Sequence, residues 1–192
     1  SKHVVVLVLG DVGRSPRMQF HARSFASLSE IARVTMIGYK GESPMPDLQS
    51  NSKVHFQFIP SINLPSIRFI SFLRAIIKGF LLLLSIFSCL WSIPSYQLIV
   101  IQNPPCLPAV VVAYLFSLCN GSKILIDWHN LGFSIYENAM GKRTTLVKFT
   151  YFLEKYVCQY FAHLHICVSK ALKQWLKQNM MKQKYFTIDL VV

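Results

Sequence analysis

Three short apolar runs in this chain each end abruptly in polar, glycine-rich or proline-rich sequence. The runs are Val4–Leu9, Leu98–Ile101 and Ile124–Ile126. Uninterrupted apolar strands are typical of parallel sheets with helices on both faces, because neither side of such a strand meets water. Ligands of open α/β sheets bind in the crevice outside the carboxyl ends of the strands. The sequence therefore predicts a parallel α/β fold with functional residues directly after each run.

The rest of the chain alternates between strand-like and helix-like segments. Strands are predicted at 3–9, 33–38, 54–59, 97–101, 122–127, 165–168 and 185–192, and helices at 16–29, 107–119, 144–161 and 170–179. This alternation predicts a doubly wound, mainly parallel sheet of Rossmann-like type. Loops are expected at 39–52 and 128–143. Ser169 is the expected N-cap of the last helix, and Gly121 is expected to adopt a positive φ after the helix at 107–119.

The helix predicted at 144–161 carries a line of large apolar side chains. They recur at helical spacing, so we expect this face to pack in the core. The side chains are Leu146, Phe149, Leu153, Tyr156 and Tyr160.

The segment 65–91 is unusually apolar, and Phe80–Trp91 holds no charged residue. That uncharged part is too short for a membrane-spanning helix, which needs roughly 20 apolar residues. A narrow polar stripe runs along the segment, at Ser71, Arg74, Lys78, Ser85 and Ser92. A helix of this kind lies on a core, in a membrane interface, or between the two. Three interpretations stay open: a core helix, a helix in contact with a membrane surface, and a membrane span.

Charge narrows the choice of partner. The net charge is +12, and no acidic residue occurs between Asp47 and Asp127. A basic, apolar, acid-free stretch suits anionic lipid head groups or phosphates. Nucleic acid is the rival partner of a basic chain, but the sequence has no basic run interleaved with aromatic residues. We therefore expect a membrane surface, through 65–91, and no nucleic acid.

Cysteine and histidine usage indicates neither disulfides nor a metal. The five cysteines all lie among apolar residues and form no Cys-x-x-Cys pair, which is typical of buried, reduced thiols. No cluster of histidines and acids has metal-ligand spacing, so no structural metal is predicted. No cofactor is expected either.

The first apolar run leads into a loop with the features of an anion site. Gly10 and Gly13 let backbone approach a ligand closely. Amides at the start of the next helix can hold an anion, beside Ser15, and Arg14 and Arg17 can pair with phosphate oxygens. The spacing matches neither a dinucleotide fingerprint nor a Walker A loop. The loop is a candidate site for a diphosphate.

The other two run ends supply polar and aromatic side chains. Candidate substrate-binding residues there are Gln102, Asn103, Asp127, Trp128 and Asn130. Packing of a buried strand requires none of them. The alternative interpretation is a turn capped by an Asx side chain beside a half-buried tryptophan.

Two residues could accept a proton from a sugar hydroxyl. The ordinary pKa of histidine suits His129 for general-base catalysis near neutral pH. Asp11 would need a raised pKa or a partner. For each of them a structural hydrogen bond remains the alternative.

These motifs resemble a known family. Residues 8–19, 102–105 and 126–130 look like the acceptor half of the chitobiosyldiphosphodolichol β-mannosyltransferases. The similarity continues through Phe133–Ser134, Glu154–Lys155 and Cys167–Ser169, up to about residue 180. The two longest motifs are more specific than generic Rossmann-like patterns.

The resemblance implies a GT-B glycosyltransferase with two Rossmann-like domains. Such an enzyme adds the first β-1,4-mannose from GDP-mannose to GlcNAc2-diphosphodolichol, with inversion, at the cytosolic face of the endoplasmic reticulum membrane. Residues 1–192 would be the acceptor-side domain, with the donor-binding domain lacking. We then expect no transfer by this chain alone, and GDP-mannose binding only together with that domain. In related inverting enzymes the base commonly follows the first strand, which favours Asp11 as base, with His129 orienting the acceptor.

Two other functions remain open. The chain could be a non-catalytic module, or a truncated product of the enzyme, that binds a lipid-linked saccharide or a partner. It could also be an unrelated basic α/β protein that binds nucleotides or nucleic acid.

Overall fold

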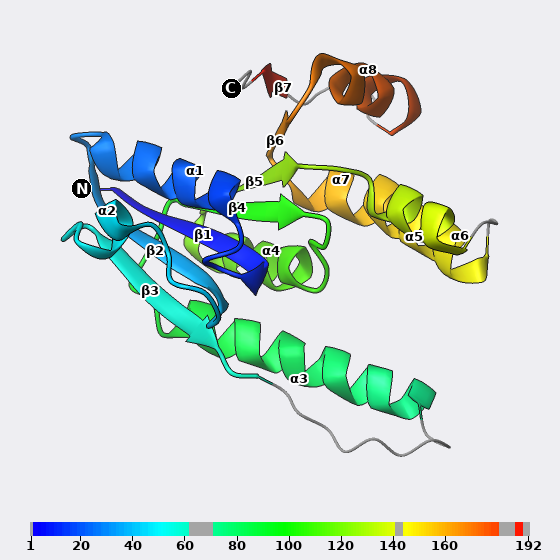
Figure 1. The fold of residues 1–192 in the computed structure, drawn as a ribbon, viewed down its shortest axis with the longest axis horizontal. Helices are drawn as coiled ribbons and strands as arrows, with labels where there is room; N and C mark the ends of the chain where they lie inside the picture. Colours follow the sequence, from blue (N-terminus) through cyan, green and yellow to red (C-terminus); the bar gives the residue numbers. More distant parts are fainter. Residues whose placement is uncertain (1, 62–70, 141–143, 181–186, 190–192) are drawn as a thin grey trace. The chain divides into compact units, whose positions relative to one another are not determined.

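A computed structural model describes residues 2–61, 71–140, 144–180 and 187–189 of the chain. The chain forms two compact units, Ser1–Gln97 and Leu98–Val192. Each unit combines parallel strands with helices, as Figure 1 shows. The predicted α/β class is confirmed in each unit, because the strands of each unit pair in parallel within the described residues.

The first unit has three strands in the order β3-β2-β1. They are β1 (Lys2–Asp11), β2 (Ile31–Tyr39) and β3 (Val54–Ile59). Val34 in β2 pairs with Val4 on one side and Val54 on the other. The run predicted to be covered on both faces is buried from Val4 to Val8. The hydrophobic pattern therefore predicted this part of the sheet correctly.

Three helices belong to the first unit. α1 (Pro16–Ser27) begins at a proline, whose fixed φ suits the first helical position, and it buries Met18, Ala22 and Ala26 one turn apart. The short α2 (Pro46–Gln49) lies within the predicted loop 39–52. α3 (Ser71–Trp91) accounts for most of the apolar segment 65–91; residues 65–70 lie outside the described residues.

α3 is buried on one face and exposed on the other. Ile86, Cys89 and Leu90 are buried, and the Gln57 side chain on β3 donates hydrogen bonds to the Cys89 carbonyl (3.3 Å) and the Ser92 hydroxyl (2.8 Å). The opposite face exposes large apolar side chains: Ile76, Ile77, Phe80, Leu84, Phe87 and Trp91. Within the described residues, no helix has both the length and the apolar character to cross a membrane. The core interpretation is therefore correct for one face of α3 only.

The second unit has its strands in the order β4-β5-β6-β7. They are β4 (Leu98–Asn103), β5 (Lys123–Trp128), β6 (Leu164–Cys167) and the short β7 (Thr187–Asp189). β7 falls within the strand predicted at 185–192, whose other residues lie outside the described part of the chain. Asn103 is level with Trp128, which is level with Cys167. The carboxyl ends of β4, β5 and β6 therefore meet at one edge.

The helices of the second unit follow the prediction with one addition. They are α4 (Ala109–Asn120), α5 (Gly132–Met140), α6 (Thr145–Phe152), the π-helical turn η2 (Leu153–Cys158), α7 (Gln159–Phe161) and α8 (Lys170–Asn179). α4 ends at Gly121 with φ 70°, and Ser169 caps α8 through its hydroxyl, as expected. α5 replaces part of the loop predicted at 128–143.

The predicted core face of the helix at 144–161 is wrong. Phe149 and Tyr160 are 56% and 66% exposed, and Leu146 and Tyr156 are exposed as well. The buried line is instead formed by Val147, Glu154 and Cys158. This helical run has apolar residues on more than one face, so periodicity alone could not identify the face that packs inward.

The predicted burial of the cysteines holds with one exception. Cys89, Cys106, Cys158 and Cys167 are buried, and Cys119 is exposed. Cys119 lies near the end of α4, where side chains leave the core although their neighbours in the sequence are apolar.

Candidate functional site

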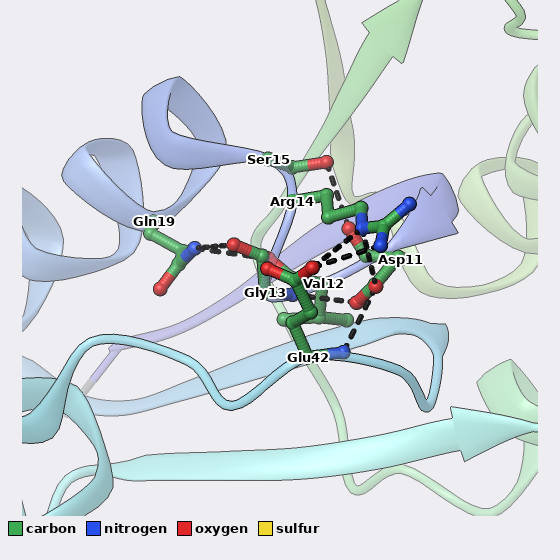
Figure 2. A network of polar contacts seen from close by, with 7 residues as sticks. All are labelled: Asp11, Val12, Gly13, Arg14, Ser15, Gln19 and Glu42. Atoms are coloured by element: carbon green, nitrogen blue, oxygen red, sulfur yellow. Dashed lines mark hydrogen bonds and ion pairs between the residues drawn. The ribbon is translucent and has the colours of Figure 1, made fainter.

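The glycine- and arginine-containing loop after β1 is held together by the Asp11 carboxylate, as Figure 2 shows. This carboxylate accepts hydrogen bonds from the backbone N–H groups of Gly13 and Glu42, each at 2.9 Å. It thereby ties the loop to residues 40–42. A Cβ at Gly41 would collide with the Asp11 carboxylate. The close approach of these two loops therefore depends on glycine at position 41.

These hydrogen bonds lower the pKa of Asp11. The backbone N–H of Glu42 contributes most to lowering the pKa of Asp11, assisted by Gly13 and the nearby Arg14 and opposed by partial burial. A carboxylate that receives such bonds is a weaker proton acceptor. A general base needs the opposite shift. The geometry therefore favours a structural role for Asp11.

Arg14 is already paired in this loop. Its Nε and terminal nitrogen lie 3.0 Å and 2.8 Å from Glu42 Oε1, and its Nε lies 3.6 Å from Asp11 Oδ2. The side chain is nevertheless 70% exposed, so the pair is open to solvent. A bound anion would have to compete with the Glu42 carboxylate for this guanidinium.

The other residues predicted to form this loop site differ in their contacts and in the space around them. The Ser15 hydroxyl donates to the Asp11 carbonyl at 3.0 Å, and Arg17 lies half-buried on the first turn of α1. Gly10 has room for a side chain, because an added Cβ would meet only Val8 Cγ1, at 3.5 Å. A Cβ at Gly13 would instead collide with the Glu42 carbonyl. Of the two predicted glycines, only Gly13 is required by close approach.

Sequence reasoning missed Gln19. Its buried amide donates to the carbonyls of Val12 and Gly13, both at 3.0 Å, and accepts from the Met45 N–H at 2.7 Å. It thus fixes the loop to the segment before α2. The only signal in the sequence was its place at the end of the motif at 8–19, because glutamine on an amphipathic helix usually faces solvent.

In the second unit, Asp127 and His129 form a pair at the end of β5. Asp127 is fully buried, and its Oδ2 lies 3.1 Å from Nε2 of His129, whose side chain is 24% exposed. The His129 N–H donates to the Asn103 carbonyl at 2.8 Å. A carboxylate on one ring nitrogen fixes the imidazole tautomer and leaves the other nitrogen as the basic one. The pair therefore has the geometry of a base with its orienting carboxylate.

Trp128 is buried and hydrogen-bonded inside the second unit. It is 1% exposed, and its indole N–H donates to His165 Nδ1 at 3.1 Å. Burial lowers the pKa of His165 to about 4, so this imidazole is the neutral acceptor that the indole needs. Trp128 therefore supports the strand end instead of offering a stacking surface.

The other predicted strand-end residues differ in how far their side chains are buried. Asn103 is 1% exposed, whereas Asn130 is exposed and accepts the Leu131 N–H at 2.8 Å, as in the Asx-capped alternative. Gln102 pairs in register with Asp127. The Oε1 atom of Gln102 is buried without a hydrogen-bond partner among the described residues.

A buried acid that sequence reasoning gave no role joins these strand ends to α5. Glu154 on η2 is 4% exposed and accepts hydrogen bonds from Asn103 Nδ2 (3.1 Å) and from the N–H groups of Gly132 (2.7 Å) and Phe133 (3.2 Å). Burial raises the pKa of Glu154, against the effect of these bonds. The only signal in the sequence was its place in a motif shared with the resembled family.

No group of three or more histidine, cysteine or acidic side chains in the described part of the chain could hold a metal ion.

Comparison with known proteins agrees with the motifs. No protein-family model matches the chain. The chain is 34% identical to the chitobiosyldiphosphodolichol β-mannosyltransferase of Mus musculus, over 93% of this chain and 36% of that protein. It is 35% identical to that of Homo sapiens, over 93% of this chain and 38% of the human protein. It is also 30% identical to the UDP-glycosyltransferase TURAN of Arabidopsis thaliana, over 91% and 38%. The resemblance is confirmed, and the chain spans little more than a third of these relatives.

Solved structures with the same fold are glycosyltransferases of low sequence identity. UGT2 of Phytolacca americana matches with a TM-score of 0.64 at 11% identity, over 100% of this chain and 54% of that one. Sucrose-phosphate synthase of Thermosynechococcus elongatus matches with a TM-score of 0.64 at 15% identity, over 99% and 48%. At such identities the likeness concerns the fold alone. It confirms the predicted Rossmann-like α/β fold.

Proposed function

We propose that this chain is the acceptor-side part of a glycosyltransferase that adds the first β-1,4-mannose from GDP-mannose to GlcNAc2-diphosphodolichol. The observation that carries the proposal is its 34% identity, over 93% of its length, to a chitobiosyldiphosphodolichol β-mannosyltransferase. On this proposal the chain acts in the synthesis of the N-glycan precursor. Its residues would hold and activate the acceptor.

The transfer requires one base in the acceptor site. The terminal sugar O4 attacks the anomeric carbon of mannose, the bond to GDP breaks with inversion, and the hydroxyl proton passes to the base. We assign this base to His129, with Asp127 holding its other nitrogen at 3.1 Å. This assignment departs from the sequence-based preference for Asp11, because the bonds to Gly13 and Glu42 occupy the Asp11 carboxylate and lower its pKa.

The loop after β1 has the chemistry for the acceptor's diphosphate. Arg14 and Arg17 can pair with phosphate oxygens, and the first amides of α1 favour an anion. Gly13 and Ser15 shape the loop, and Gly10 borders it. In the second unit, Gln102 and Asn130 remain proposed sugar contacts, while the buried side chains of Asn103, Asp127 and Trp128 support them.

A lipid-linked acceptor has to be reached at a membrane surface. The exposed apolar face of α3 lies in a stretch without acidic residues, and Lys78 is exposed beside it. Amphipathic helices of this kind bind at the lipid interface, and basic residues add attraction to anionic head groups. We therefore place the proposed contact on α3, at the cytosolic face of the endoplasmic reticulum membrane.

Binding of a soluble acceptor analogue tests the function. The chain is titrated with chitobiose diphosphate carrying a short prenyl chain, in parallel with the same prenyl diphosphate lacking the sugar. We expect saturable binding that is at least about tenfold tighter for the compound with chitobiose. Equal affinity for both compounds, or none for either, would contradict an acceptor site.

A matched pair of arginine variants localises the diphosphate. Arg17→Ala should weaken binding of the chitobiose compound about tenfold or more, because it removes a charged partner of phosphate. Arg23→Ala is the control, since Arg23 carries the same charge on the same helix but lies beyond the first turn, away from the N-terminal amides of α1. If both variants lose affinity equally, the attraction is general charge and not a site.

A further inference from the structure

Glu154 is a buried acid to which the proposed reaction assigns no step. It is the one acidic residue between positions 144 and 161, and it is 4% exposed. It lies on the π-helical turn η2, a kind of distortion that often occurs at functional sites. Burying a carboxyl group is costly unless hydrogen bonds compensate. A carboxyl group buried at this place is therefore expected to have a role beyond packing.

The carboxylate caps α5 from another helix. The N–H groups of Gly132 and Phe133, both in the first turn of α5, donate to Oε1 and Oε2 at 2.7 Å and 3.2 Å. First-turn amides have no acceptor within their own helix, and a negative charge there is favourable. Glu154 therefore determines where α5 begins, immediately after the turn that carries His129.

Glycine at position 132 permits this contact. A Cβ there would lie 2.9 Å from Glu154 Oε1 and 3.2 Å from the Cβ of Pro104. Any larger residue would push the carboxylate away from the helix start. Glycine at position 132 thus leaves room for the Glu154 carboxylate that caps α5.

The same carboxylate also fixes the end of β4. Glu154 Oε1 accepts from Asn103 Nδ2 at 3.1 Å, and the Asn103 carbonyl accepts the His129 N–H at 2.8 Å. The turn bearing His129 is thus held on one side through Asn103 and on the other by the start of α5. We propose that Glu154 is a positioning residue that sets the orientation of His129 against Asp127. The functional weight of this role depends on the function proposed above.

A cavity lies next to this hydrogen-bond network and is bordered by some of the same residues. It has a volume of about 210 Å³ and is bordered by Asn103, Pro104, Gly132 and Glu154, with Leu146 and Phe149 on its apolar side. The hydrogen bonds of Glu154 therefore shape a hollow at the end of β4 as well as the turn after β5. Loss of these bonds would alter both together.

NMR of the complete chain tests the positioning directly. Glu154→Gln keeps the shape but loses the charge and one acceptor oxygen. We expect it to remain folded, while the His129 amide exchanges with solvent about tenfold faster and the ring resonances of His129 move to new chemical shifts as the imidazole turns relative to Asp127. Glu30→Gln, at an exposed turn, is the charge-matched control and should change neither.

The outcomes separate the two proposals. Unchanged amide exchange and unchanged ring resonances of His129 in folded Glu154→Gln would overturn the positioning role, whatever the chain binds. Altered His129 signals in a chain that does not bind the acceptor analogue would support positioning and reject the proposed function. If Glu154→Gln does not fold, Asn103→Ser breaks the same link and is measured instead; an unmoved His129 there also overturns the proposal.

Discussion

At the scale of single residues, Asp11 and His129 began as equivalent candidates, and their surroundings separate them. Each follows a buried strand and each carries a group that can accept a proton. The Asp11 carboxylate is engaged by two backbone N–H groups that lower its pKa. Among the described residues, a fully buried carboxylate engages one ring nitrogen of His129. An occupied carboxylate suits a structural anchor, and a partly exposed imidazole with a fixed tautomer suits a base.

We predict that His129→Ala and Asp11→Asn fail in different ways when built into a full-length enzyme. His129→Ala should lower the turnover number on the order of a hundred- to ten-thousand-fold, with acceptor affinity unchanged, because it removes general-base catalysis. Asp11→Asn should lower the stability of the loop and the affinity for the diphosphate, with a smaller effect on turnover. Steady-state kinetics and acceptor titration measure both. If neither variant reduces turnover tenfold, these strand ends serve binding only.

At the scale of helices and strands, the sequence predicted most strands and long helices, because continuous apolar runs and caps are local signals. The N-cap at Ser169 and the positive φ of Gly121 are examples. α5 was missed because its start is capped by Glu154, which lies 22 residues further along the chain. Long-range partners of this kind leave no local pattern.

The same limit applies to the candidate site. Motifs identified Asp11, Asn103 and Asp127 as special residues, but could not show that they are engaged with backbone or buried partners. Trp128 was expected to contact a ligand, yet its indole N–H is bonded to His165. Residue type and position at a strand end are visible in a sequence, whereas side-chain direction depends on packing that only the structure supplies.

We predict opposite effects on stability for two Gly→Ala substitutions. Gly41→Ala should lower the free energy of unfolding by about 1–3 kcal/mol, because the new Cβ would displace the Asp11 carboxylate from its backbone partners. Gly79→Ala, in the interior of α3 with nothing near its Cβ position, should raise it by about 0.5–1 kcal/mol through helix propensity. Urea denaturation measures both. A Gly41→Ala chain as stable as the parent would mean that the loops after β1 and β2 are not locked together.

At the scale of the whole molecule, charge and exposed apolar surface coincide. The chain has a net charge of +12, and the stretch between Asp47 and Asp127 contains no acid. Within that stretch α3 exposes a row of large apolar side chains that ends at Trp91, which is 74% exposed. Contiguous apolar surface on a folded protein usually marks a binding face. The basic, acid-free character of this stretch favours an anionic lipid surface over a basic or neutral partner.

We predict that the chain floats with vesicles that contain anionic lipid, and less so as salt is added. Screening shortens electrostatic range to about 10 Å at 0.1 M salt, so the basic contribution weakens while the apolar contact persists. Phe80→Asp with Trp91→Asp should abolish flotation, because both side chains lie on the exposed face of α3. Leu115→Asp with Leu118→Asp is the matched control, since these exposed leucines lie on α4. If the parent chain stays out of the lipid fraction at low salt, the membrane interpretation of α3 is wrong and only the core interpretation remains. If both double variants lose flotation equally, the attraction belongs to no particular face.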